Sequence, residues 1–178
     1  MQKSQWWEGQ VRPDLSQGDI VGPIPIVSVT YPPKYLQKNN FRGNISGLLE
    51  SLEVKKEKDG RISVFSAGHL MWGIVLSHDC DVDKPKENKT VLVASIGRIE
   101  DVPQEHQETI TSQSNIPRMF LPSVPSIGDC YAALRTTVYV PRDLVDSAPR
   151  IASMSDQARD FLQARIVAFF TRRKLPPA

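Results

Sequence analysis

The alternation of apolar and polar positions predicts a chain built mainly from short strands. β-Branched residues dominate 20–29, and Pro23 and Pro25 should bend this first strand, because proline cannot donate to a ladder and is confined to edges or bulges. Near-continuous apolar runs predict a central, buried strand over 70–76 and another strand over 89–99. Two further strands are predicted at 118–121 and 130–141.

Two long insertions separate these strands. The first, over 31–66, is polar and contains Asp59-Gly60 between two alternating apolar runs. This dipeptide is the strongest short hairpin signal in the sequence, and it predicts a hairpin over 47–66. The second, over 100–128, begins with an acidic, amide-rich stretch that has no clear period, and it is predicted to be a loop or a short exposed helix.

Helical spacing of apolar residues is clearest near the end of the chain, over 155–173. Ser155 is a suitable N-cap, and Asp156 lies in the first turn, where the helix dipole favours an anion. Residues 1–13 have no sustained period and are interpreted as an N-terminal arm. Strands followed by one terminal helix predict a mainly β (α+β) fold, a small barrel of mostly antiparallel strands in a single domain, 1–178.

Composition narrows the class of protein. The chain has 178 residues, 40% apolar and 24% charged, as expected of one soluble domain, and its fourteen prolines exclude a helix bundle. We found neither a long apolar run nor a secretory signal, so we expect a cytoplasmic protein that does not contact membranes. Cys80 and Cys130 are expected to be free thiols. A net charge of +2 argues against duplex DNA binding.

The densest polar cluster, Ser77 to Asp81, directly follows the predicted strand over 70–76. Residues at the end of a rigid strand are held in position to meet a substrate. Here His78 could act as a general base, Cys80 as a nucleophile, and Asp79 could orient either. In the alternative, structural interpretation, Cys80 is a small apolar residue that closes the core. No second cluster has the spacing of metal ligands, so neither a metal nor a cofactor is predicted.

Two arginines on predicted strands are candidate anion contacts. Arg98 follows one apolar strand, and Arg135 lies inside another, beside Thr136. Because a guanidinium is always charged and binds phosphate in a forked geometry, either arginine could contact RNA. The alternative is a salt bridge to a nearby acid. His106, in the acidic stretch, is interpreted as a solvated surface residue.

Five segments, taken in order, resemble the layout of the PemK/MazF family of toxin-like small barrels. They are QGDIV at 17–21, GIVLS at 73–77, TVLVASI at 90–96, ALRTTVYVPRDLV at 133–145 and RIASMSDQARDFLQARIVAFF at 150–170. The resemblance implies an SH3-like barrel, commonly a homodimer. In the toxin members it also implies metal-independent RNA cleavage, in which a base takes the 2′-hydroxyl proton, arginine stabilises the phosphorane, and an antitoxin peptide blocks the groove.

The sequence departs from the family pattern at two places. Residues 71–73, Met-Trp-Gly, stand where the family toxins carry arginine-proline, and residues 95–97, Ser-Ile-Gly, stand where they carry proline-isoleucine-threonine. Arg135 occupies the position of the family's strand arginine, and Arg98 or His78 could replace the missing groups. A small barrel with replaced catalytic groups is also a plausible binding module, because fold does not fix function.

Two functions are therefore predicted. The first is an endoribonuclease toxin or effector, with His78 or Asp79 as base and Arg98 and Arg135 on the phosphate. The groups that position its substrate would be Ser77, Ser95 and Thr136. The second is a non-catalytic regulatory module of a toxin-antitoxin, phage or defence system that binds another protein through the barrel groove and the insertion over 31–66. A redox or metal switch at Cys80 is a third, smaller alternative.

Overall fold

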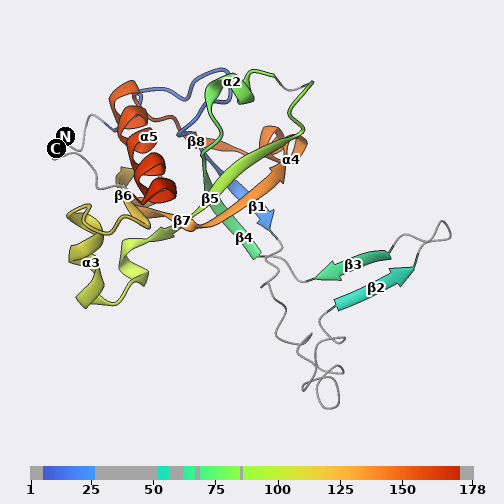
Figure 1. The fold of residues 1–178 in the computed structure, drawn as a ribbon, viewed down its shortest axis with the longest axis horizontal. Coiled ribbons are helices and arrows are strands. Elements are labelled where there is room, and N and C mark those ends of the chain that lie inside the picture. The colour runs from blue at the N-terminus through green and yellow to red at the C-terminus, as the bar shows by residue number, and fades with distance from the viewer. Residues whose placement is uncertain (1–5, 27–51, 57–61, 67–68, 85, 173–178) are drawn as a thin grey trace, which may run out of the picture. The chain divides into compact units, whose positions relative to one another are not determined.

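The computed structural model describes residues 6–26, 52–56, 62–66, 69–84 and 86–172 (Figure 1). The chain divides into two compact units, Met1–Ile24 with Met71–Ala178, and Pro25–Leu70. The larger unit contains the described helices and most of a six-stranded sheet, and the smaller unit contains a two-stranded hairpin.

The strands of the larger sheet are β1 (Ile20–Ile26), β4 (His69–Val75), β5 (Thr90–Arg98), β6 (Arg118–Val124), β7 (Gly128–Pro141) and β8 (Arg150–Ala152). Their order is β6-β7-β5-β4-β1-β8, and every pair with a defined register is antiparallel. The mainly β, mixed α+β class predicted from the sequence is confirmed. Because β6 and β8 lie at opposite edges, the described strands form an open sheet.

Two details of the strand predictions are refined. β1 lies between β4 and β8, but β8 pairs only with Ile20 and Val21, so Pro23 lies beyond that ladder, where a missing donor costs nothing. β4 is central in the sheet as predicted, and its residues 73–75 are buried. The expectation that the whole run over 70–76 is buried is wrong at its start, because Leu70 is 70% exposed.

The smaller unit contains the predicted hairpin. β2 (Leu52–Lys56) and β3 (Ile62–Ser66) pair antiparallel, with Leu52 opposite Ser66 and Lys56 opposite Ile62. The Asp59-Gly60 signal between them lies outside the described residues, as do residues 27–51 of the first insertion.

Five helical segments accompany the strands in the described part of the chain: α2 (Asp79–Val82), the 3₁₀ turn η3 (Ile99–Asp101), α3 (Gln104–Thr111), α4 (Arg142–Ser147) and α5 (Asp156–Thr171). α5 begins as predicted, because Ser155 caps it by accepting a hydrogen bond from the N–H of Ala158. The second insertion contains α3, so of the two structures predicted there, the short exposed helix is the one that forms.

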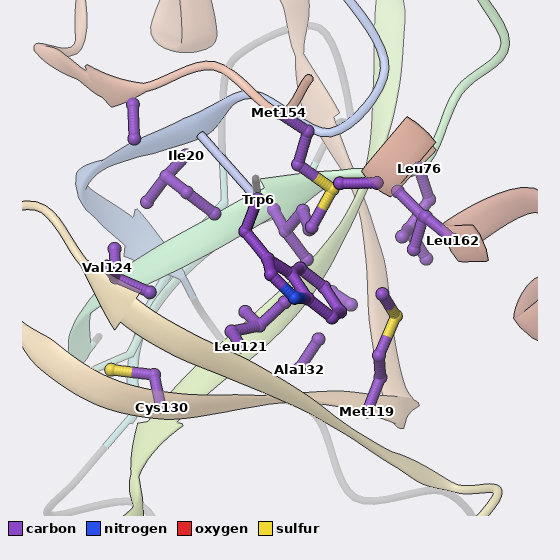
Figure 2. Close-up of a cluster of buried hydrophobic side chains, with 14 of the residues drawn as sticks. Trp6, Ile20, Leu76, Met119, Leu121, Val124, Cys130, Ala132, Met154 and Leu162 are labelled. Carbon is purple, nitrogen blue, oxygen red and sulfur yellow. The ribbon is translucent and has the colours of Figure 1, made fainter. Parts of the chain in front are cut away.

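One hydrophobic core lies between α5 and the sheet (Figure 2). Leu162 on α5, Met119 and Leu121 on β6 and Ala132 on β7 are all buried in it. Trp6, from the segment interpreted as an arm, also belongs to this core: it is 5% exposed and meets Phe161 edge to face at 5.7 Å. Burial of a side chain this large contributes about 1.5–3 kcal/mol, so residues 6–13 are tied to the sheet.

Candidate functional site

A surface hollow of about 880 Å³ lies on the β5-β7-β6 part of the sheet, beside α3. We call it the groove. Its floor and walls include Ser95, His106, Arg118, Tyr131, Arg135 and Thr136, together with the loop 114–117. Three residues predicted as site residues, Ser95, Arg135 and Thr136, therefore share one cavity.

Strand alternation explains which β7 side chains reach the groove. Successive side chains of a strand point to opposite faces of a sheet. Ala132 and Leu134 are buried in the core beneath α5, whereas Tyr131, Ala133 and Arg135 line the groove. One strand thus supplies apolar residues to the core and polar or aromatic residues to the groove.

The pairing of β5 with β7 is interrupted where Arg135 lies. Ala94 is opposite Thr137, but the next residue, Ser95, is opposite Ala133, so residues 134–136 of β7 have no partner on β5. A bulge of this kind bends the strand and re-aims its side chains, and bulges are common next to functional sites. The bulge leaves Arg135 and Thr136 exposed at the groove rather than aligned in the ladder.

Arg118 and Tyr131 form a stacked pair in the groove. Arg118 is opposite Ala133 in the β6-β7 register, which makes Tyr131 its diagonal neighbour on the same face. The Arg118 guanidinium carbon lies 5.3 Å from the centre of the Tyr131 ring, a cation-π distance. The ring has room because its β5 partner is Gly97, where a Cβ would lie 2.6 Å from the tyrosine ring. Glycine at 97, one of the departures from the family pattern, thus creates space for an aromatic groove residue.

α3 forms one wall of the groove and contributes His106. The helix is fixed by Ile110, which is completely buried with Val102 and Phe120 in a second small hydrophobic cluster that Tyr131 borders. His106 itself is exposed, with Nε2 3.9 Å from the carboxylate of Glu105.

The second wall is the loop that joins α3 to β6, and α5 holds it in place. Gln113 has a positive φ of 62°, and its side-chain amide donates to the Phe120 carbonyl and accepts from the Phe120 N–H. Arg165, completely buried on α5, donates from Nη1 to the Gln113 carbonyl and from Nη2 to the Asn115 carbonyl, both at 2.7 Å. Burial lowers the pKa of the Arg165 guanidinium, and no carboxylate in the described part of the chain pairs with it. Arg165 is therefore a structural clamp for the groove wall.

The groove is electropositive. Among the described residues none of those lining it is acidic, whereas Arg118 and Arg135 bring two positive charges. Arg135 is exposed and has no ion pair with any described residue, so its guanidinium is available to a ligand. Arginines, hydroxyl groups and an aromatic face are the groups that bind phosphate and nucleobases.

The other predicted site residues lie elsewhere. Arg98 borders a separate hollow of about 260 Å³ beside Ile127 and Gly128, and it forms a 2.8 Å salt bridge with Glu100 that raises the pKa of the guanidinium. The salt-bridge alternative weighed for this arginine is the arrangement found.

Ser77, His78 and Asp79 make structural contacts at the opposite end of β5. The Ser77 hydroxyl accepts from the Leu92 N–H at 2.8 Å. His78 caps α2, with its Nδ1 accepting from the N–H of Cys80. Asp79 accepts from the Gln17 N–H at 2.6 Å and pairs with Arg159 at 2.7 Å, which ties the N-terminal segment to α5.

These contacts separate the four residues predicted as catalytic. Ser77 contacts Leu92, and Arg98 lies six residues farther along the same strand, or about 20 Å at the rise of an extended chain. The structure therefore does not bring His78 and Asp79 together with Arg98, and of the four predicted residues only Arg135 lines the groove.

The two cysteines are both free, as expected, but their environments differ. Cys80 is exposed, with Sγ 2.8 Å from Nδ1 of His78, so the interpretation that it closes the core is wrong. Cys130 is buried in the core, and burial raises the pKa of its thiol to about 11. The described residues include no cluster of three or more His, Cys, Asp or Glu side chains that could hold a metal ion.

Sequence reasoning did not assign His106, Arg118 or Tyr131 to a site, although all three line the groove. Arg118 lies at the start of a predicted strand, but the place of its side chain depends on which strands are neighbours in the sheet. The order β6-β7-β5 cannot be derived from the hydrophobic pattern of the sequence. None of the described helices is long and apolar enough to cross a membrane. No protein-family model matches the chain, and no curated protein matches it in sequence.

Proposed function

We propose that this protein binds RNA in the groove and cleaves it without a metal, as a toxin-like endoribonuclease of the PemK/MazF kind. The observation that carries the proposal is a single cavity that combines Arg118, Arg135, His106 and Tyr131 with no acidic lining residue among those described. Two cations attract a phosphodiester, the tyrosine face accepts a base, and an imidazole can act as a general base.

In this proposal the reaction is internal transesterification. His106 takes the proton of a ribose 2′-hydroxyl, and the 2′-oxygen attacks the adjacent phosphorus. The bond from phosphorus to the 5′-oxygen breaks as water donates a proton to that oxygen, which leaves a 2′,3′-cyclic phosphate and a 5′-hydroxyl, and protonated His106 returns its proton to the resulting hydroxide. Arg118 and Arg135 stabilise the charge on the five-coordinate phosphorus. His106 thus takes the role that the sequence analysis gave to His78 or Asp79.

The proposal includes the finer features that the family resemblance implies. The six-stranded antiparallel sheet would be the wall of an SH3-like barrel, and the protein would be a cytoplasmic homodimer. An antitoxin or other protein partner would inhibit it by occupying the groove. The electropositive lining favours an acidic inhibitory peptide.

Cleavage of mixed RNA by the purified protein, with and without EDTA, tests the proposal. We expect cleavage that persists in EDTA and falls at least about 10²-fold in His106→Ala, since general acid-base catalysis is typically worth about 10²–10⁴ in rate. Arg135→Ala should be similarly impaired. His78→Ala is the matched control, because His78 caps α2 away from the groove, and it should cleave at the wild-type rate. Absence of cleavage, or loss in His78→Ala but not in His106→Ala, would contradict the proposal.

A second candidate function is protein binding through the hairpin. β2 and β3 form a two-stranded sheet, so each has an edge without a partner strand among the described residues. Such an edge can add a strand from another protein. Pull-down of the intact protein and of a version lacking residues 31–66 tests it, and a partner retained by the deletion variant would exclude the insertion as the docking surface.

A further inference from the structure

A second hollow, of about 530 Å³, adjoins the groove. It lies where the C-terminal end of α5 meets the loop before β6, and its lining includes Phe169, Phe170 and Arg172. It shares Arg135, Ile116 and Pro117 with the groove. The two hollows therefore share Arg135, an exposed residue, as part of their lining.

Phe170 gives the second hollow an exposed aromatic surface. Its side chain is 58% exposed, which is unusual for so large an apolar group. Its ring meets that of Phe169 edge to face at 5.1 Å, and Phe169 packs against the core. The core thus supports Phe169, which in turn supports the Phe170 ring from one side.

Two arginines line the same hollow as this aromatic surface. Arg172 ends α5 in a left-handed conformation, with φ of 55°, and is exposed beside Phe170. Arg135 lies at the junction with the groove, and among the described lining residues of the second hollow there is again no acid. A hollow that combines an aromatic ring with two arginines is one that a nucleobase and its neighbouring phosphates would complement.

This inference rests on the proposed function: we propose that the second hollow is a subsite for a nucleobase next to the phosphate that binds at Arg135. One phosphate binds at Arg135, the base on one side of it lies in the groove near Tyr131, and the base on the other side stacks on Phe170, with the following phosphate near Arg172. Bases of a duplex are stacked inside the helix and cannot spread over two hollows. The protein therefore selects strands whose bases are free to separate.

Binding of a fluorescein-labelled 2′-O-methyl oligonucleotide, measured by anisotropy at fixed salt, tests this subsite without interference from cleavage. We expect single strands to bind at least tenfold more tightly than a duplex of the same sequence. Phe170→Ala should weaken single-strand binding about 5- to 150-fold, since stacking contributes about 1–3 kcal/mol per base, and Phe170→Trp should restore it. Val167→Ala is the matched control, because Val167 is 55% exposed on the same helix but does not line the hollow.

Arg172→Gln gives an independent readout. It should reduce the slope of log affinity against log salt by about 0.7, the value for one phosphate contact on a single strand. If the wild-type protein binds neither single strands nor duplex, the proposed function itself fails. If the wild-type protein binds single strands, and if both Phe170→Ala and Arg172→Gln bind them as tightly as the wild type does, then RNA occupies only the groove and the subsite is refuted. Equal affinity for duplex, or concentration-dependent self-association that Phe170→Ala abolishes without changing RNA affinity, would also overturn the inference.

Discussion

Replacing the buried arginine of α5 should release the wall of the groove. In Arg165→Met the side chain keeps an unbranched apolar stem but loses the guanidinium and its donors. Gln113 would lose the guanidinium that its carbonyl contacts at 2.7 Å, and a buried acceptor left without a donor costs about 1–3 kcal/mol. The Asn115 carbonyl still accepts a hydrogen bond from the Arg118 N–H and loses only the one from Arg165. This second loss adds about 1 kcal/mol to the destabilisation.

The expected loss is therefore about 2–4 kcal/mol in the free energy of unfolding. Urea denaturation measures it directly, and the melting temperature should fall by about 4–16 °C, since 1 kcal/mol corresponds to about 2–4 °C for a chain of this size. Arg165→Lys should recover little, because one ammonium group replaces two donor nitrogens that reach separate carbonyls. Gln157→Met, at an exposed position of the same helix, is the control for introducing methionine and should change stability by less than about 0.5 kcal/mol.

Wild-type stability in Arg165→Met would refute this reasoning. It would mean that the cost of burying an unpaired guanidinium, which replacement by methionine removes, equals what its hydrogen bonds contribute. Hydrogen exchange provides a local check. Amides of residues 113–118 should exchange faster in the variant than in the wild type, whereas those of β5 should change only with global stability.

Three other predictions test separate parts of the structure. A thiol reagent at pH 8 should modify only the exposed Cys80 in the native protein and both cysteines in denaturant, because Cys130 is buried and its pKa is raised to about 11. Rapid modification of both thiols in the native protein would contradict this. Asp19 is completely buried, and burial raises its pKa above the ordinary 3.8, so protonation of Asp19 favours the folded state. In urea melts across pH, the stability of the wild type relative to Asp19→Asn should therefore be greatest below about pH 4 and should fall as pH rises through the raised pKa. A relative stability that rises with pH would exclude this cause. Gly97→Ala should destabilise the protein by about 1–3 kcal/mol through a clash with Tyr131. In a double-mutant cycle this cost should largely disappear when Tyr131 is also replaced by alanine, and an equal cost in both backgrounds would show that the strain lies elsewhere.

Local signals in the sequence predicted local structure well. The cap at Ser155 and the helical spacing after it located α5, and the runs before Arg98 and around Arg135 located β5 and β7. These features depend on neighbouring residues, so a single sequence carries them. The length of β7 was underestimated by two residues at its start, where Gly128 has a positive φ of 98° and gives no strand signal.

The candidate site depends on contacts between distant residues, and for this reason the sequence predicted only part of it. Arg135, predicted as a site residue, lines the groove, yet the bulge that exposes it is visible only in the β5-β7 register. His78 was favoured over His106 because it follows a buried strand, whereas the position of His106 depends on how Ile110 anchors α3 against the sheet. α3 contributes a single completely buried side chain, Ile110, to that cluster. One buried position gives no helical period of apolar residues that the sequence could show.

The clamp formed by Arg165 couples the groove to the terminal helix thermodynamically. A ligand that binds only when the loop at 113–118 is in place also binds only when α5 is docked. Ligand binding and the docking of α5 therefore stabilise each other. At a ligand concentration 100 times its Kd, the folded state is stabilised against the unfolded state by about 2.7 kcal/mol. Occupancy of the groove would then protect α5, on the far side of the loop, from proteases that require an undocked helix.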